Sequence, residues 1–467
     1  MRSLVQSIVA ATLILAVLAC AFFWLIGRET VVEREEVLFS AYAPTDIERL
    51  TVENARGSFE VYREGDGYVV DDIPSEYIDL EDFVAFMTRM GAISALKRVS
   101  EGPEDDALYG LDAPLSAGWI RYLDGTVLTL ELGAQDMVSN HYYLRVNGER
   151  PVYLLSKEVA EGLLAYKTDY MDRTVTPKLT VTSPLSAIRD VIFSGDRLKK
   201  PIAIRSVKGG GEEVRLAAIS FGAVTHLVEG KGLYELDQTY GIEILGSILD
   251  MVAREVVDYN VTDRQFTEYG FDNSSMNVWF VMNDGEEYLL RLVDTNSGML
   301  AHISSKNVIY HIDRPAFADV QYDRLILRWF LSPLLLEMSG MTVEFSDKRC
   351  EIRYRRISNS EQYATVNGRD VGIDHFQAFY RLITSAAADG SYFPDAEPLG
   401  EAVLTITYHY SNAAKADDVL RLYPGSARRF LVEVNGICEF DIRESFYTRV
   451  REGILNLEAG QPIEENW

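Results

Sequence analysis

The chain has 467 residues, of which 47% are hydrophobic, 25% charged and 11% aromatic, so it can bury several cores and is unlike a disordered chain. Its formal net charge is −26, from 71 acidic and 45 basic residues. Nucleic-acid binding needs a basic patch and none stands out in the sequence, so we expect no nucleic-acid partner. The same acidity argues against a body that lies flat on an anionic membrane.

The N-terminal segment is predicted to be a membrane anchor. Residues 4–26 carry no charge, and a helix of this length spans the hydrocarbon core of a bilayer. We therefore expect a transmembrane anchor over residues 1–27, with the membrane contacted by residues 4–26. Two alternatives stay open, which are lipidation of Cys20 and cleavage as a signal peptide. The apolar run that follows Cys20 argues against both.

The rest of the chain is expected outside the cytoplasm. A short tail, one anchor and a long body are typical of a single-pass protein of the cell membrane with an extracytoplasmic body. Residues 28–45 are predicted to be a tether. The body contains Cys350 and Cys438, for which two buried thiols are favoured and one disulfide stays open.

The body contains internal sequence repeats. Tyr109-Gly110-Leu111-Asp112 recurs 160 residues later as Tyr269-Gly270-Phe271-Asp272. The same spacing relates Trp119 to Trp279. A third copy lacks the Tyr-Gly-x-Asp signature, but residues 430–436 parallel residues 143–148. These matches predict three tandem repeats, the third of them divergent, at residues 46–166, 180–320 and 340–455.

Each repeat is expected to fold as an α+β unit. An apolar stripe with the i, i+3, i+4, i+7 spacing of a helix occurs once in each copy. The stripes are Phe83, Phe86, Met87 and Met90; Leu245, Ile248, Leu249 and Val252; and Phe376, Phe379, Tyr380 and Ile383. Alternating strand-like segments flank the stripes, and glycine-containing turns such as Asp124-Gly125 join them. We therefore predict a mainly antiparallel sheet with one packed helix in each copy.

The repeated Tyr-Gly-x-Asp motif supplies the only candidate site residues: Tyr109, Gly110 and Asp112, and Tyr269, Gly270 and Asp272. The favoured interpretation is structural, with each glycine forming a tight turn and each aspartate accepting nearby backbone N–H groups. The alternative is a ligand or cation contact in each copy.

No catalytic, cofactor or metal residues are predicted. Six histidines are scattered along the chain, and surface or hydrogen-bonded roles are favoured over a metal pair formed by His302 and His311. The sequence has no HExxH helix and no G-x-S-x-G nucleophile elbow. We therefore expect a protein that is not an enzyme and that needs no cofactor.

An ordered set of segments in the first copy resembles a known family. The set consists of Tyr109-Gly110-Leu111-Asp112-Ala113-Pro114, the Asp124-Gly125 hairpin, Leu130-Glu131-Leu132-Gly133 and Tyr142-Tyr143-Leu144-Arg145-Val146. It resembles the bacterial domain of unknown function 4340 family. The second copy departs from the pattern, with Asn273-Ser274 in place of Ala113-Pro114 and Val293 in place of Gly133.

The resemblance implies a class of partner. Members of the family are membrane-anchored extracytoplasmic proteins, often associated with gliding-type ABC transporter systems. The expected function is therefore a non-enzymatic auxiliary or scaffold subunit of an ABC-type export complex, with permease and ATPase subunits as partners. A binding module for an envelope polymer or small ligand is the leading alternative, and a hydrolase whose site is assembled from distant acids is the third.

Overall fold

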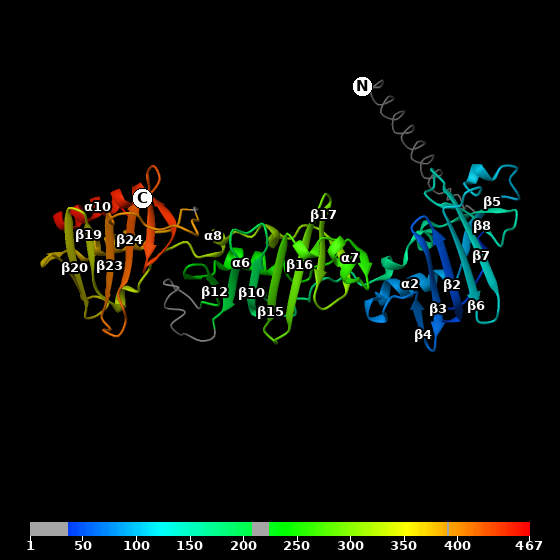
Figure 1. Ribbon diagram of the computed structural model, residues 1–467, viewed down its shortest axis with the longest axis horizontal. Coiled ribbons are helices and arrows are strands. Elements are labelled where there is room, and N and C mark those ends of the chain that lie inside the picture. The colour runs from blue at the N-terminus through cyan, green and yellow to red at the C-terminus, as the bar shows by residue number, and fades with distance from the viewer. Residues whose placement is uncertain (1–35, 208–223, 390–391) are drawn as a thin grey trace, which may run out of the picture. The chain divides into compact units, whose positions relative to one another are not determined.

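The computed structural model describes residues 36–207, 224–389 and 392–467 (Figure 1). The predicted anchor, Cys20 and the first part of the tether lie outside these ranges. Among the described residues, no helix is both long and apolar enough to cross a membrane. By their internal contacts the residues form two compact units, Met1–Asp172 and Arg173–Trp467.

The first unit contains a nine-stranded sheet with strand order β1-β5-β9-β8-β7-β6-β2-β3-β4, all neighbours antiparallel. Its strands are β1 (Val37–Leu38), β2 (Ile47–Asn54), β3 (Gly57–Glu64), β4 (Gly67–Val70), β5 (Ser94–Ser100), β6 (Ser116–Tyr122), β7 (Val127–Gln135), β8 (Tyr142–Val146) and β9 (Val152–Leu155). Its helices are α2 (Leu80–Gly91) and α3 (Lys157–Leu164). Helix α2 begins where Asp79 accepts hydrogen bonds from the backbone N–H groups of Glu81 and Asp82.

The second unit begins with another nine-stranded antiparallel sheet, in the order β13-β12-β11-β10-β15-β16-β17-β18-β14. Its strands are β10 (Ile188–Ser194), β11 (Ile202–Ser206), β12 (His226–Glu229), β13 (Leu233–Glu235), β14 (Glu255–Tyr259), β15 (Met276–Met282), β16 (Glu287–Thr295), β17 (Gly298–Ile303) and β18 (Val308–Ile312). Its helices are α4 (Pro184–Ala187), α6 (Gln238–Gly246), α7 (Asp263–Glu268) and α8 (Tyr322–Leu325).

The second unit ends with an eight-stranded antiparallel sheet in the order β22-β21-β20-β19-β23-β24-β25-β26. Its strands are β19 (Met338–Phe345), β20 (Lys348–Arg356), β21 (Gln362–Val366), β22 (Arg369–Val371), β23 (Leu404–Tyr410), β24 (Asp418–Pro424), β25 (Arg429–Val434) and β26 (Ile437–Arg443). Its helices are α9 (Ile373–Thr384) and α10 (Glu444–Ala459). The fold is therefore α+β and rich in antiparallel sheet, as predicted.

The three sheets have corresponding strand orders. In each, the first long strand (β2, β10 or β19) lies inside the sheet, and the strands that follow it before the helix lie on one side of it. On the other side of this first long strand lie four strands that follow the helix in the sequence. Strand β14 returns to the far edge of the second sheet, and β5 takes the same place in the first sheet with only β1 beyond it. The described part of the third sheet has no such strand.

A β-bulge recurs at the beginning of this first strand. The pairing register shifts between Ile47 and Arg49 in β2, between Ile188 and Asp190 in β10, and between Met338 and Gly340 in β19. A bulge bends its strand and increases the local twist. The three sheets therefore agree in local shape as well as in strand order, although different side chains occupy the positions.

The prediction that the second apolar stripe, residues 245–252, lies on one helix is wrong. Helix α6 ends at Gly246, so Ile248, Leu249 and Val252 lie beyond it, and Val252 is exposed. The chain turns here because Asp250 has a positive φ of 54° and its backbone N–H donates to Pro177 O at 3.0 Å. The first and third stripes lie within α2 and α9 as predicted.

The two cysteines of the body are free and buried. Cys350 lies in β20 and Cys438 in β26, with β19, β23, β24 and β25 between these strands. Neighbouring strands lie about 4.8 Å apart, far too great a separation for a disulfide across this sheet. The favoured interpretation of two buried thiols is confirmed.

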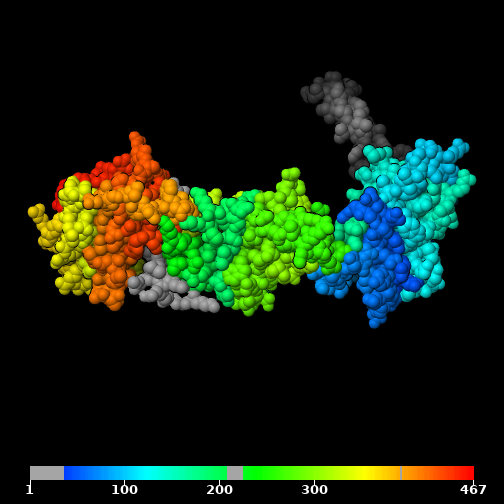
Figure 2. All heavy atoms as spheres, viewed as in Figure 1, coloured from blue at the N-terminus to red at the C-terminus, as the bar shows by residue number. Residues whose placement is uncertain are grey.

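A hairpin tip joins the second sheet to the third. The β12–β13 turn lies against β26, and Lys231 Nζ donates to Ala396 O at 2.8 Å. A Cβ at Gly230 would overlap the hydroxyl of Tyr322, so only glycine lets the turn approach so closely. Figure 2 shows atoms of the third sheet, in orange, directly against the green atoms of the second.

Glu439 lies at the centre of this contact. It is 1% exposed and sits at a bulge of β26, which turns its side chain out of the ladder. Its carboxylate accepts hydrogen bonds from Lys231 N at 2.6 Å and from the Tyr322 hydroxyl at 3.2 Å. Burial and the nearby Glu439 charge raise the pKa of Tyr322, so this phenol stays a hydrogen-bond donor.

Candidate docking site

The Tyr-Gly-x-Asp motif of the first sheet forms a short 3-10 turn, Asp106–Tyr109, which ends at Gly110. Gly110 has φ 65° and ψ 26°, and its backbone N–H donates to Ala107 O at 3.2 Å. A Cβ at this position would lie 2.7 Å from the backbone nitrogen of Ala134. Glycine is therefore required both by the backbone conformation and by the close approach to β7.

The aspartate of the motif does not have the predicted role. Asp112 is exposed, and the described residues offer its side chain no hydrogen-bond partner. The turn is capped from its other end, where Asp105 Oδ1 accepts a hydrogen bond from Ala107 N at 3.0 Å. The capping acid thus precedes the turn, where it can accept the free N–H groups of the first residues.

In the second sheet the motif connects α7 to the turn Phe271–Asn273. Gly270 has φ 86°, and a Cβ there would meet only Val293 Cγ1, at 3.5 Å. Tyr269 donates to Asp258 Oδ2 at 3.1 Å, and Asp272 accepts from the Thr267 hydroxyl at 2.6 Å. Asp272 therefore holds a side chain and not the backbone N–H groups that the sequence predicted.

An ion pair holds the first motif on its sheet. Arg145 of β8, which is mostly buried, pairs with Asp106 of the turn and with Glu131 of β7 at 3.7 Å. The ring of Tyr109 also meets that of Tyr143 edge to face, with centroids 5.0 Å apart. These contacts fix the turn to the ends of β7 and β8.

An uncharged histidine takes the corresponding place in the second sheet. The cross-strand pair Glu131 and Arg145 corresponds to Arg291 and His302. The His302 ring lies 4.9 Å from that of Phe266 and 5.9 Å from that of Phe271. Burial, assisted by the charge of Arg291, lowers the pKa of His302 to about 4.

The histidines give no sign of a metal pair. His302 lies in this aromatic cage, whereas Nδ1 of His311 faces Glu255 at 3.2 Å. Within residues 36–207, 224–389 and 392–467, no group of His, Cys, Asp and Glu side chains is arranged to hold a metal ion.

The β7–β8 loop beside the first motif presents two apolar side chains to solvent. Met137 is 89% exposed and Val138 is 94% exposed, more than any other large hydrophobic side chain in the described residues. We call this pair the apolar tip. The two adjacent side chains form a small exposed apolar patch at the end of the loop, where leaving them in water is unfavourable.

The backbone under the apolar tip is fixed. Asp136 Oδ2 accepts hydrogen bonds from the backbone N–H of Ser139, at 3.0 Å, and from its hydroxyl. Asp136 Oδ1 accepts from the Tyr143 hydroxyl at 3.3 Å. Hydrogen bonds from Ser139 lower the pKa of Asp136, so it stays ionised at neutral pH. Tyr143 thereby links the tip to Tyr109, and hence to the repeated motif.

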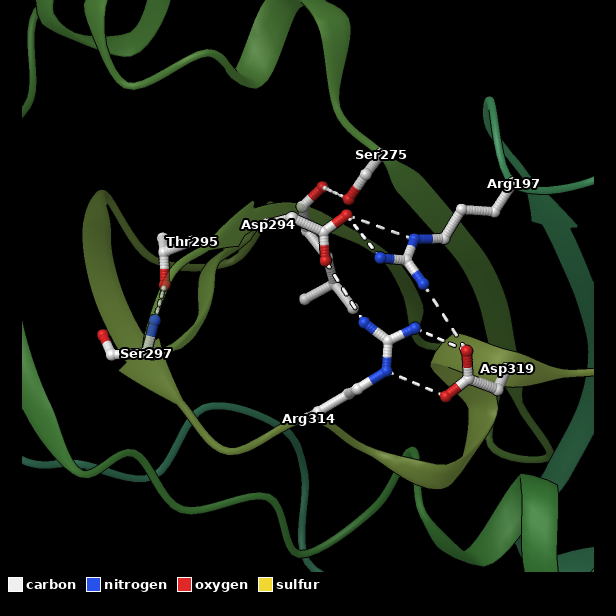
Figure 3. A network of polar contacts seen from close by, with 8 residues as sticks. Arg197, Ser275, Asp294, Thr295, Ser297, Arg314 and Asp319 are labelled. Atoms are coloured by element: carbon white, nitrogen blue, oxygen red, sulfur yellow. Dashed lines mark hydrogen bonds and ion pairs between the residues drawn. The ribbon is translucent and has the colours of Figure 1, made fainter.

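The corresponding end of the second sheet is closed by a ring of charges (Figure 3). Asp294, at the end of β16, accepts from Arg197 Nη2 at 2.6 Å and from Arg314 Nη1 at 3.2 Å. Asp319 accepts from Arg314 Nε at 2.8 Å and from Arg197 Nη1 at 3.5 Å. Two arginines and two aspartates thus satisfy one another.

The matching end of the third sheet is also charged. Arg429, at the start of β25, forms a two-pronged pair with buried Asp441 and a further contact with Asp389 at 3.0 Å. Asp389 in turn accepts from Arg443 at 2.6 Å. Among the described residues of the hairpin loops at these three ends, only Met137 and Val138 of the first sheet are exposed large hydrophobic side chains.

The apolar tip was not recognised from the sequence. Met137-Val138 is visible there as an apolar pair between Asp136 and Ser139. A pair of this kind is equally compatible with a strand end that buries one side chain. Exposure depends on the loop conformation that Asp136 and Tyr143 fix, and that contact joins a loop residue to a residue of β8.

Comparison with known proteins supports the resemblance seen in the first copy. The family described as domain of unknown function (DUF4340) matches residues 78–212. The matched segment includes both the first Tyr-Gly-x-Asp motif and the apolar tip. No curated protein and no solved structure matches the chain.

Proposed function

We propose that this protein is a non-enzymatic auxiliary or scaffold subunit of an ABC-type export complex, anchored in the cell membrane through residues 4–26. The body lies on the extracytoplasmic side and consists of three copies of one α+β module. The apolar tip, Met137 and Val138, is the observation that carries the proposal, because it gives the first module a preformed contact for another protein. The partner class rests on the family resemblance, which the match over residues 78–212 supports.

The energetics of the tip suit such a contact. Complete burial of a Met or Val side chain contributes about 1.5–3 kcal/mol, so the pair can strengthen binding by two or more orders of magnitude. Asp136 already fixes the loop, and little ordering cost is added on binding. An anchor in the same membrane as the partner would raise the effective concentration further.

Co-purification tests this function. Full-length tagged protein is extracted from native membranes in mild detergent, and the recovered proteins are identified and quantified. We expect a permease and an ATPase with the wild type and at least about a tenfold loss with the double variant Met137→Asp, Val138→Asp. Leu399→Asp is the matched control, because Leu399 is 80% exposed but lies in the third module.

The outcomes separate the parts of the proposal. Loss of the transporter subunits with both variants would mean that added charge, and not the tip, disrupts the complex. Unchanged recovery with the tip variant would overturn the role of the tip. Recovery of no membrane partner with intact wild-type protein would overturn the auxiliary-subunit function itself.

A binding module for an envelope polymer or small ligand is the second candidate. A cleft of about 670 Å³ lies where the second and third sheets meet, with Lys199 on one side and Tyr392 and Phe393 on the other. Its size and its aromatic lining suit a small ligand. A ligand screen that follows the thermal unfolding of the full-length protein tests this candidate, since a ligand bound to the folded state raises Tm.

A further inference from the structure

The third sheet carries a local concentration of positive charge in a strongly acidic chain. Strand β20 (Lys348–Arg356) has five basic residues among nine, and residues 346–371 carry six basic and four acidic side chains, a net charge of +2. The whole chain carries −26. The overall composition hides this strand, which the sequence analysis did not single out as a basic patch.

Strand alternation places the arginines of β20 on the outer face. Cys350, Ile352 and Tyr354 are buried, so Arg353 and Arg355 point the other way. Arg355 lies opposite Tyr363 of β21. Arg353 lies opposite Gly340 of β19, where the two backbones approach so closely that a Cβ would overlap the carbonyl oxygen of Ile352. A cavity of about 920 Å³ opens over this face.

The charges of the cavity leave one cation available. Arg353 is already paired with Glu351 at 2.8 Å. No carboxylate of the described residues lies within ion-pair distance of Arg355, whose side chain is exposed. Asp370, the other acid of the lining, stands opposite Thr365 on the neighbouring strand. A guanidinium without a partner can bind a carboxylate or phosphate through two parallel hydrogen bonds.

The remaining lining suits a ligand rich in hydroxyl groups. Tyr363 is 51% exposed and offers a ring face, while Ile357 extends the apolar surface beside it. Glu351 and Asp370 can accept hydrogen bonds from ligand hydroxyls, and Thr365 can donate or accept. Because these residues lie on paired strands, their positions are fixed before a ligand arrives.

We propose that this face of the third sheet binds an acidic polymer of sugars or polyols. Arg355 holds a carboxylate or phosphate group of the polymer, and Tyr363 stacks on an adjacent ring or carbon chain. The acids of the lining bind hydroxyl groups. This function is separate from the docking of the first module and does not depend on the apolar tip.

Affinity electrophoresis of the purified full-length protein in detergent tests the proposal. The gels contain polygalacturonate, poly(glycerol phosphate) or neutral dextran. We expect retardation by at least one anionic polymer, at least about tenfold weaker affinity for Arg355→Ala, and a smaller loss for Tyr363→Ala. The polymer that retards the protein identifies the recognised group as carboxylate or phosphate. Arg355→Lys should restore only part of the affinity, because an ammonium cannot form the two-pronged contact.

Arg349→Ala is the matched control. Arg349 is an exposed arginine of the same strand, but it pairs with Glu344 at 2.9 Å and does not line the cavity. Equal losses for Arg349→Ala and Arg355→Ala would overturn the proposal in favour of diffuse charge attraction, as would equally tight binding of DNA. Absence of retardation by both anionic polymers would overturn it outright. The variant Met137→Asp, Val138→Asp should bind the polymers normally, so failure here is distinct from failure of the docking function.

Discussion

The first and second sheets carry the same Tyr-Gly-x-Asp turn but hold it by different chemistry. In the first sheet, Arg145 pairs with Asp106 and Glu131. In the second, the uncharged ring of His302 lies between Phe266 and Phe271. Both glycines have positive φ, so the common element is the backbone turn. The comparison teaches that the motif specifies the backbone conformation of the turn, whereas the side chains that surround the turn differ between the two sheets.

The two turns also differ in how closely they approach the sheet. In the first, a Cβ at Gly133 would overlap the carbonyl oxygen of Tyr109. Val293 stands at the corresponding position of the second sheet, and the turn there leaves room for it. We call each Tyr-Gly-x-Asp turn, together with the strand ends beneath it, the corner of its sheet. The first corner is therefore more tightly packed, and it is also the corner that presents the apolar tip.

The largest effect on stability is expected when each of these two residues is replaced, in a separate variant, by the residue found in the other sheet. Gly133→Val would force a branched side chain against the Tyr109 carbonyl and destabilise the first unit by about 3 kcal/mol or more. Val293→Gly should cost only about 1–2 kcal/mol, through lost packing and added chain flexibility. Denaturant unfolding of the full-length protein gives both values, and hydrogen exchange of residues 105–146 localises the first. An equal loss of unfolding free energy in the two variants would contradict the proposed difference in packing between the two sheets.

The pH response should also separate the two corners. The folded state holds the pKa of His302 at about 4, below its ordinary value near 6.5. Protonation therefore favours the unfolded state, and stability is lost as the pH falls from about 6.5 to about 4, by at most about 3 kcal/mol. Hydrogen exchange of residues 262–303, corrected for the intrinsic rate, measures this loss. His302→Phe should remove it, whereas His311→Gln should not.

The hydrogen bonds that Asp136 accepts in the first sheet should not respond in that pH range. Hydrogen bonds from Ser139 hold the pKa of Asp136 below its ordinary value. The hydrogen bonds that Asp136 accepts are therefore present above about pH 4 and are lost only as the pH falls further. Faster exchange of the Ser139 amide, which donates to Asp136 Oδ2, between pH 6.5 and 5 would contradict this expectation.

The smallest effect is expected from the charge ring of the second sheet. Asp319→Asn removes one acid from a solvent-exposed network and should cost about 0.5–1 kcal/mol at low salt. Hydrogen bonding to Arg314 lowers the pKa of Asp319, so its contribution is present above about pH 4 and is lost on acidification. The difference from wild type should shrink at about 1 M salt, where screening acts within about 3 Å. An effect independent of salt would mean that the ring acts through packing.

Local features of the fold could be predicted from the sequence, and distant contacts could not. The turn glycines, the stripes of α2 and α9 and the antiparallel strands follow from preferences that span a few residues. The second stripe failed because Gly246 and Asp250 end the helix in the middle of an apolar run. Arg145 with Asp106, and His302 with Phe266, join residues about 40 positions apart, which no local pattern encodes. The apolar tip and the basic face of β20 depend in the same way on which side of a strand or loop faces solvent.

The buried Glu439 determines how the second half of the chain can be divided. Separating the second and third sheets would expose Tyr322 and Gly230 on one part and Glu439 on the other, and would break the hydrogen bond between Tyr322 and Glu439. The stacking of Tyr322 on Phe440 across this contact would also be lost, which would leave both aromatic rings exposed to water. A fragment that ends between these sheets should therefore be insoluble, whereas residues 173–467 should melt in one step.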